Sequence, residues 1–176
     1  MTNVNLDKVH SALNFEVKHM MVSKAKGEFQ SFDVDFNGSF DDLTNASVKA
    51  TIDVASIETN NDDRNGHLKS EDFFNVEQHP HITFVSKNIE KVSDEEYKIT
   101  GDLTIKGVTN QETFTATYNG KAKDPMQGNT IAGADVEGKI NREDYGLTWN
   151  APLETGGVLI GKEVKFSGGF EFVVEE

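Results

Sequence analysis

The sequence contains no cysteine, and only two of its 17 basic side chains are arginines. The lack of cysteine excludes disulfides, thiolate metal ligands and a thiol nucleophile. Basic residues are also outnumbered, because 30 aspartates and glutamates give a formal net charge of −13. Nucleic-acid binding needs a basic surface, and so large an acidic excess also opposes approach to anionic membranes. We therefore expect no nucleic-acid partner.

Long apolar runs are missing as well. No stretch approaches the roughly 18 apolar residues of a membrane span, so no integral membrane segment is expected. The first eleven residues, MTNVNLDKVHS, lack the basic start and apolar run of a signal peptide. We expect a cytoplasmic protein with a single domain over residues 1–176, large enough to bury a sizeable core.

Apolar and polar side chains alternate over most of the chain, with Phe32, Val34 and Phe36 separated by Asp33 and Asp35 as an example. A period of two is typical of strands with one buried face. It recurs in eight segments: 13–19, 32–40, 48–54, 82–84, 97–105, 114–118, 132–140 and 164–174. The sequence therefore predicts an all-β protein, an extended eight-stranded antiparallel up-and-down β-barrel. A two-sheet sandwich is the alternative.

Several predicted inward positions carry very small residues: Ala50, Ala116, Ala132, Ala134, Gly101, Gly138 and Gly168. An eight-stranded barrel can be filled by side chains or can hold one small ligand, so small residues favour an apolar cavity. The alternative is that the glycines only relieve bends in long strands. Eleven larger inward residues are predicted to line the cavity and contact its ligand: Phe15, Val17, Val34, Phe36, Ile52, Phe84, Leu103, Ile105, Val136, Phe166 and Phe170.

The two longest connections, residues 58–80 and 142–162, fall at the same end of an up-and-down barrel. Both arginines lie in them, which predicts a positive cluster suited to a polar or anionic head group at the cavity mouth. Six residues are predicted to bind there: His19, Arg64, His67, Phe73, Phe74 and Arg142. The alternative is that the arginines only hold their own loops through neighbouring carboxylates: Asp62, Asp63, Glu143 and Asp144.

The first connection contains an unusually polar run, TNNDDRNGHLKSEDFF, at residues 59–74. Asp62 or Asp63 can cap one short helical turn, and Ser70 or Asp72 another. Short helical segments are therefore expected within residues 58–80. We interpret the run as a lid over the cavity, with its two phenylalanines as walls or anchors of the mouth.

Other motifs resemble metal or catalytic sites without completing one. Residues 33–42 match the first half of a calcium loop, but its twelfth position is Thr44 instead of a bidentate glutamate. The HPH run at 79–81 offers too few ligands for a metal site. Two sets could form a hydrolase triad but lack a strained nucleophile elbow: Asp7, His10 and Ser11, and His67, Ser70 and Asp72. We expect no metal, no cofactor and no catalysis.

Motifs along most of the chain are similar to those of one known family. They are Asp7 with His10-Ser11, Val17-Lys18-His19-Met20, Gly27 and Phe29, SIETNN at 56–61, Arg64 with His67-Leu68-Lys69-Ser70, Asp72-Phe73-Phe74, Pro80 with Phe84, GDLTIKGVT at 101–109, and Asn141-Arg142 with Asp144-Tyr145-Gly146. In this order and spacing they resemble the YceI-like family of bacterial polyisoprenoid-binding proteins. The resemblance implies a lipocalin-like barrel, often dimeric, with a tubular apolar cavity for a long isoprenoid or similar lipid.

Pattern and resemblance together predict a cytoplasmic homodimer that binds, transports or stores a long-chain isoprenoid or related amphiphilic lipid without turnover. The alternatives are a small enzyme acting on a lipid or lipid diphosphate, and a ligand-free, stress-related interaction barrel. Asn65 departs from the family pattern, which usually has aspartate after the arginine. If that aspartate orients Arg64, Asp62 or Asp63 is expected to do so here.

Overall fold

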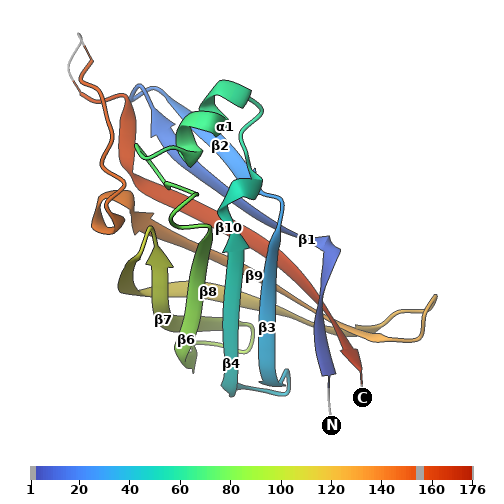
Figure 1. Cartoon of the computed structure of the whole chain (residues 1–176). Helices are drawn as coiled ribbons and strands as arrows, with labels where there is room; N and C mark the ends of the chain where they lie inside the picture. The colour runs from blue at the N-terminus through green and yellow to red at the C-terminus, as the bar shows by residue number, and fades with distance from the viewer. Residues whose placement is uncertain (1–2, 154–156, 176) are drawn as a thin grey trace.

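The computed structural model describes residues 3–153 and 157–175, which form one antiparallel sheet with a short helix (Figure 1). The strands are β1 (Asn3–His19), β2 (Ser23–Phe29), β3 (Phe32–Ser39), β4 (Asp42–Asp53), β5 (Ile57–Glu58), β6 (His81–Lys91), β7 (Glu96–Ile105), β8 (Val108–Lys123), β9 (Thr130–Asn141) and β10 (Ile160–Glu175). The α-helix is α1 (Asp62–Lys69), and the 3-10 turns are η1 (Val54–Ser56) and η2 (Arg142–Tyr145). No helix in the described ranges is long and apolar enough to cross a membrane.

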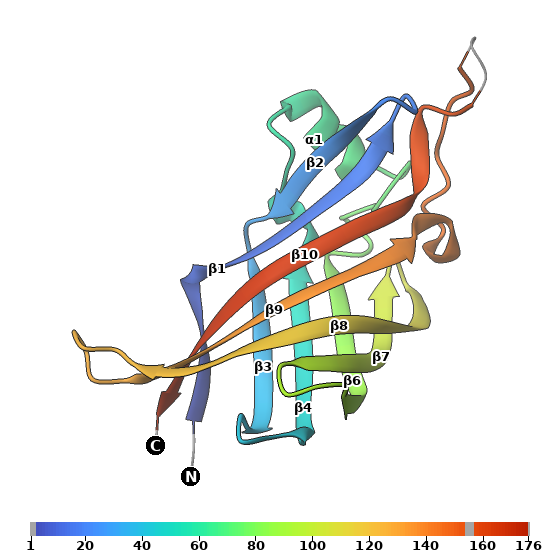
Figure 2. The same ribbon diagram turned by 180° about the vertical axis from the view of Figure 1, so that it is seen from behind.

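The strands follow the order β3-β4-β6-β7-β8-β9-β10-β1-β2-β5, and each neighbouring pair is antiparallel. Figures 1 and 2 show β3, β4, β6 and β7 lying across β8, β9, β10 and β1. The sheet thus curls over on itself and buries apolar side chains between two layers. Because β3 and β5 end the hydrogen-bonded order, the result is a half-barrel without a closed ring of hydrogen bonds.

The predicted all-β antiparallel fold is confirmed. The eight predicted segments fall on β1, β3, β4 and β6 to β10, and β10 returns to pair with β1. The count of eight is two short, because the alternation does not predict β2 or β5. The inward residues of β2 include Ala25 and Gly27, whose small size weakens the hydrophobic period. The ring of Phe15 occupies the space over Gly27, where a Cβ atom would lie 2.9 Å from Phe15 Cε1.

Glycines of the curled sheet make room for phenylalanine rings. A Cβ atom on Gly138 would overlap Phe114 Cδ1 and lie 2.8 Å from Phe166 Cε1. One on Gly168 would lie 2.6 Å from Phe170 Cζ. The prediction that small residues leave space in the cavity is correct for three alanines that line it: Ala50, Ala116 and Ala134. It is wrong for four residues that do not line it: Ala132, Gly101, Gly138 and Gly168.

The polar run at residues 59–74 folds into α1 and a following turn, which confirms the predicted helical segments. Asn61 Oδ1 accepts a hydrogen bond from Arg64 N at 3.0 Å and caps the helix, whereas the prediction placed the cap on an aspartate of the first turn. Ser70 caps the next turn as predicted, because its Oγ accepts a hydrogen bond from Asp72 N at 3.3 Å. The lid segment is therefore ordered by its own polar side chains.

Candidate ligand-binding cavity

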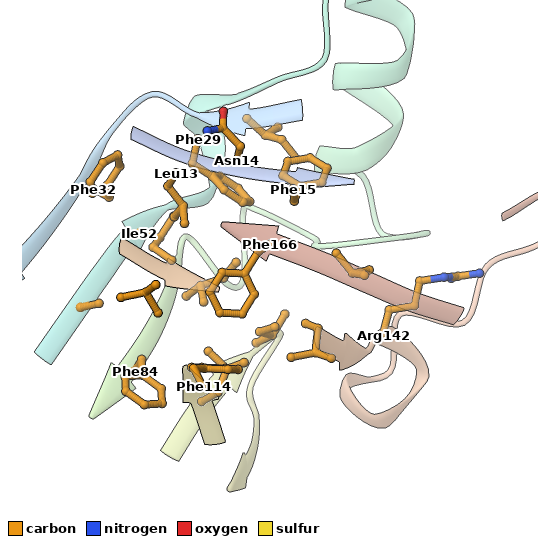
Figure 3. A pocket seen from close by; sticks show the side chains of 18 of the residues that line it. Leu13, Asn14, Phe15, Phe29, Phe32, Ile52, Phe84, Phe114, Arg142 and Phe166 are labelled. Carbon is orange, nitrogen blue, oxygen red and sulfur yellow. The ribbon is translucent and has the colours of Figure 1, made fainter. Parts of the chain in front are cut away.

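A cavity of about 440 Å³ lies between the two layers of the sheet. Figure 3 shows Phe84, Phe114 and Phe166 around one part of it, with Leu13 and Ile52 nearby. Phenylalanine, leucine, isoleucine and valine form most of the lining, which extends from α1 to the β3–β4 turn. Its volume falls within the roughly 300–1,000 Å³ of typical ligand sites. The space can take an extended apolar molecule.

All eleven predicted lumen residues line this cavity: Phe15, Val17, Val34, Phe36, Ile52, Phe84, Leu103, Ile105, Val136, Phe166 and Phe170. Their contact with a ligand remains a prediction. Further aromatic residues line the same space without having been predicted: Phe29, Phe32, Phe40, Phe114, Tyr118, Trp149 and Phe172. Five of them lie in predicted segments on the alternating apolar positions, so the period alone could have identified them: Phe32, Phe40, Phe114, Tyr118 and Phe172.

Four rings form the end of the cavity next to the β3–β4 turn, and we call this cluster the aromatic end: Phe36, Phe40, Tyr118 and Phe172. Phe36 and Phe40 stack with centroids 4.2 Å apart and planes 2° from parallel. Tyr118 stacks on Phe40 at 5.8 Å, and Phe172 lies 5.6 Å from Phe40. Phe40 and Phe172 are buried and Phe36 and Tyr118 are half-buried, so ring packing holds this end together.

The opposite end, which we call the mouth, is formed by α1, the loop after η2 and the end of β1. All six residues predicted there line the same cavity as the lumen residues: His19, Arg64, His67, Phe73, Phe74 and Arg142. The prediction that both long connections lie at one end is thus confirmed (Figure 1). Head-group binding by these residues stays a prediction.

Arg142 is only 3 % exposed, and its guanidinium is surrounded by backbone carbonyls. Four oxygens accept its hydrogen bonds: those of Gly161 (2.7 Å), Leu147 (2.5 Å), Trp149 (3.0 Å) and Ile160 (3.3 Å). Burial lowers the pKa of Arg142, opposed by the charge of Glu143, and an arginine still remains protonated. In Figure 3 its side chain points away from the central rings, toward the loop. Arg142 therefore holds the loop after η2 against the start of β10.

Arg64 is also held by hydrogen bonds to uncharged groups. Its Nε donates to Thr59 Oγ1 at 2.9 Å, and its Nη2 donates to Thr59 O at 2.6 Å. No ion pair among residues 3–153 and 157–175 includes Arg64 or Arg142. The alternative that the arginines hold their loops is supported, but through carbonyl and hydroxyl oxygens instead of the four carboxylates considered.

Asn65 explains how Arg64 is oriented without an aspartate. Asn65 Oδ1 accepts hydrogen bonds from Thr59 N at 2.9 Å and Thr59 Oγ1 at 2.6 Å. Its Nδ2 donates to Glu58 Oε2 at 2.8 Å, and this bond is the main cause of the lowered pKa of Glu58. The expectation that Asp62 or Asp63 orients the arginine is therefore wrong. An aspartate side chain at position 65 would have no N–H to donate and would face the carboxylate of Glu58.

Three rings join the two long loops across the mouth. The ring centroid of His67 lies 5.0 Å from that of Phe73 and 4.6 Å from that of Trp149, and Phe73 and Trp149 are 5.5 Å apart. His67 Nε2 also lies 2.9 Å from Asp72 Oδ2. We call these three rings the clasp. Trp149 is the sole tryptophan of the chain and lies in a loop already assigned to the mouth, a signal that could have identified it.

The two sets of residues considered for a hydrolase triad are not arranged as one. Ser70 Oγ donates to the backbone oxygen of His67 at 2.6 Å, and Ser11 Oγ donates to the backbone oxygen of Asp7 at 2.7 Å. A serine nucleophile instead needs its hydroxyl on the imidazole of the general base. Ser70 holds a turn of the backbone, and Ser11 holds the irregularity in β1 between Asp7 and Ala12.

Comparison with known proteins gives a consistent result. The YceI-like domain family matches residues 5–172. A UPF0312 protein of Staphylococcus aureus (strain MSSA476) is 49 % identical over 176 residues, covering 100 % of both chains. The crystal structure of Burkholderia cenocepacia BcnA covers 95 % of this chain and 99 % of its own, with a TM-score of 0.82 and 23 % identity. A polyisoprenoid binding domain from Saccharophagus degradans covers 99 % and 100 %, with a TM-score of 0.73 and 14 % identity. At these identities the two structures establish a shared fold.

Proposed function

The chain belongs to the YceI-like family, and from this premise we propose that it binds one long-chain isoprenoid or related amphiphilic lipid inside its cavity. The proposed role is transport or storage, without turnover and without a cofactor. The observation that carries the proposal is the continuous apolar lining between the mouth and the aromatic end. The similar fold of a domain described as polyisoprenoid-binding supports the choice of ligand class.

Tail burial can supply the affinity. Each methylene taken from water contributes about 0.8 kcal/mol, so ten contribute roughly 8 kcal/mol before the costs of binding. Selectivity between tails is weaker, because one methylene more or less changes binding by only about 1–3 kcal/mol in an apolar pocket. Cavity length and the polar groups of the mouth must therefore discriminate between ligands.

Arg142 has one donor left for a head group, and Arg64 has three. Arg142 has committed four of its five N–H groups to carbonyls, whereas Arg64 has committed two of five to Thr59. We propose that a head group sits at the rim beside His19 and His67, with its charge still in contact with water. The positive charge of Arg142 then acts at a distance, whereas Arg64, which lines the cavity, keeps donors for a head group.

Native mass spectrometry of the purified protein, followed by organic extraction, tests this proposal. A lipid adduct with one long chain per protein is the expected result. Phe84→Trp should fill the lumen and remove the adduct, and Val136→Trp should do the same from the opposite layer. Val85→Trp is the matched control, because Val85 neighbours Phe84 in β6 but is 45 % exposed. Unchanged lipid content in folded lumen variants would contradict the proposal.

Two other functions give different results in the same experiments. A lipid-processing enzyme would convert added lipid or lipid diphosphate and lose that activity on His67→Ala, whereas a carrier returns the lipid unchanged. An interaction barrel without ligand would give no adduct even after incubation with polyprenol. The serine positions described above favour a carrier over a serine hydrolase.

A cytoplasmic location and a homodimer complete the proposal, and both rest on the sequence and the family resemblance. Cell fractionation checks the location. Analytical ultracentrifugation checks the oligomeric state, and a single species of monomer mass at micromolar concentration would contradict the dimer.

A further inference from the structure

The turn between β1 and β2 carries three consecutive exposed apolar side chains, which we call the apolar tip: Met20, Met21 and Val22. They are 46 %, 54 % and 88 % exposed. Single exposed apolar residues are ordinary on protein surfaces, but a contiguous group at the apex of a hairpin marks a candidate contact surface. Among the other residues that the structure describes, large exposed apolar side chains are isolated, such as Val92 in the β6–β7 turn and Met126 between β8 and β9.

Turn geometry does not explain these residues. Met20 and Met21 have φ values of 53° and 66°, and Val22 N donates to His19 O at 3.3 Å. A tight turn with two positive φ values favours asparagine and glycine, because a Cβ atom is strained there. Methionine at both positions costs stability that Asn-Gly would not. The side chains at the tip are therefore explained by a contact outside the chain better than by the fold.

The flanks of the tip are basic within an acidic protein. Residues 17–27 contain three lysines, all exposed, and no acidic residue: Lys18, Lys24 and Lys26. Lys24 Nζ lies 3.6 Å from Glu16 Oε1, a long ion pair whose lysine is exposed to water and which is therefore weak. The turns at the other end carry acidic residues: Asp41, Asp42, Asp94, Glu95 and Glu96. Acidic residues also lie at the mouth, in α1 and η2, so the basic character is a property of the β1–β2 hairpin. Apolar side chains between lysines complement an anionic lipid surface.

The tip belongs to the rim of the cavity mouth. His19, the residue before it, lines the cavity, and Met20 N donates to Leu159 O at 2.8 Å. Met21 packs against the backbone of Gly157, where a Cβ atom would lie 3.0 Å from Met21 Cγ. Figure 2 shows this hairpin beside the start of β10, at the same end as α1. A surface that docks on the tip therefore faces the mouth.

We propose that the apolar tip and its lysines form a docking surface for an anionic lipid bilayer. Insertion of the three side chains to the level of the acyl boundary, with lysines at the phosphates, places the mouth against the membrane. The use of such docking for lipid exchange rests on the proposed function, whereas the surface itself does not depend on what fills the cavity.

The net charge of −13 does not prevent this contact at physiological salt. The Debye length is about 10 Å at 0.1 M ionic strength, so charges far from the docked surface are largely screened. The lysines of the hairpin then contribute most to the electrostatic interaction with the membrane. Binding is consequently expected to be weak and reversible, and to fall as salt rises.

Vesicle sedimentation tests the surface with phosphatidylcholine vesicles, either alone or containing about one third phosphatidylglycerol. The wild type should sediment with the anionic vesicles and much less with the neutral ones. Met20→Asn combined with Met21→Gly and Val22→Ser should lower the partition coefficient about tenfold. Because Asn-Gly suits this turn, the melting temperature should stay equal or rise. Met126→Ser with Val92→Ser, which removes exposed apolar side chains elsewhere, should leave vesicle binding unchanged.

A charge variant separates the two parts of the surface. Lys24→Glu should weaken binding to anionic vesicles about tenfold, and Lys98→Glu on the outer face of β7 should not. Either no wild-type binding to anionic vesicles, or equal binding by the tip variant and the wild type, overturns the proposal. The proposal is also overturned if the tip variant binds vesicles like the wild type but changes from dimer to monomer in analytical ultracentrifugation. The tip would then be an interface between two copies of the chain.

Lipid content measured in the same preparations keeps this proposal apart from the proposed function. A tip variant that keeps its lipid adduct but no longer sediments with vesicles supports the docking surface. A wild type that sediments through the tip but never carries lipid overturns the proposed function and leaves the docking surface standing.

Discussion

The two ends of the cavity are held by different chemistry. At the aromatic end, Phe36, Phe40, Tyr118 and Phe172 pack ring against ring, and Phe40 is only 8 % exposed. At the mouth, loops are held by hydrogen bonds from arginines to backbone oxygens and by the clasp of His67, Phe73 and Trp149. Three of the four rings of the aromatic end belong to strands and Phe40 lies in the short β3–β4 turn, whereas most of the mouth belongs to the long connections between strands.

This difference gives the two ends different capacities to change. Close-packed rings have few alternative arrangements, because interiors pack at crystal-like density. Loops held by a small number of polar contacts open at lower free energy than core strands. We therefore infer that ligand enters and leaves at the mouth, and that the aromatic end limits how much chain the cavity accepts.

The largest expected effect is at the aromatic end. Phe40→Ala removes the ring that stacks on both Phe36 and Tyr118, and should lower the free energy of unfolding by about 3–5 kcal/mol. Phe74→Ala, at a half-buried ring of the mouth, should cost less. Urea unfolding measures both. Equal losses would show that the two ends are equally rigid.

The second largest loss of unfolding free energy is expected from removal of the buried Arg142. Arg142→Ala leaves four carbonyl oxygens without their donor and should cost about 3 kcal/mol. Arg142→Lys should recover only part of this, because an ammonium cannot reach four carbonyls arranged for a planar guanidinium. Trp149 fluorescence reports on the released loop during the same urea titration. A variant as stable as the wild type would show that the loop does not depend on the guanidinium.

The middle of the cavity gives an intermediate effect. Gly138→Ala forces a methyl group into the rings of Phe114 and Phe166 and should cost about 1–3 kcal/mol. Gly133→Ala in the same strand is the control, because its nearest neighbours would lie 3.9 Å from the new Cβ atom. Thermal unfolding compares the two. If both substitutions are neutral, Gly138 serves no packing role.

The smallest expected effect is a pH dependence on the outer surface of β1. Asp7 Oδ2 and Glu171 Oε2 lie 2.8 and 3.2 Å from His10 Nδ1. The hydrogen bond with Asp7 raises the pKa of His10 above 6.5, and the same bond lowers the pKa of Asp7 below 3.8. The contribution of His10 to the free energy of unfolding is therefore complete below the pKa of the unfolded state. It is lost as pH rises through the raised pKa of the folded state. The aspartate contribution is lost only as pH falls through its lowered value.

Comparison of His10→Ala with the wild type isolates this contribution. The wild-type melting temperature should decline as pH rises through the raised pKa of His10, and the variant should decline less. His81→Ala removes another exposed histidine and should keep the wild-type decline. Parallel curves for the wild type and His10→Ala would contradict the assignment.

The sequence predicted the parts of the molecule that repeat and missed those set by single contacts. The alternation of apolar and polar residues predicted eight of the strands. It also predicted eleven lumen residues, all of which line the cavity, because inward side chains repeat with a period of two. β2 was not predicted, because its inward residues Ala25 and Gly27 are too small to produce a clear hydrophobic period. The partners of Arg142 are backbone oxygens from residue 147 to residue 161, and no side-chain pattern encodes them.

The positions of charged residues in the sequence predicted where the arginines lie but not which groups they bind. Placing both arginines at the mouth was correct, yet their neighbouring carboxylates suggested ion pairs that the structure replaces with bonds to Thr59 and to carbonyls. Asp62 and Asp63 precede Arg64 directly in the sequence. The direction of the Arg64 side chain is nevertheless determined by the geometry of α1 and by the cap at Asn61. Orientation of this kind appears only in three dimensions.

Trp149 fluorescence offers the most direct test of a cavity that holds a lipid with its polar end at the mouth. This sole tryptophan lines the cavity at the clasp. Two versions of one long-chain amphiphile are compared, brominated either near the polar end or at the terminal methyl group. Strong quenching by the first and weak quenching by the second is the predicted result. Stronger quenching by the terminal bromine, or no quenching by either, would contradict the account.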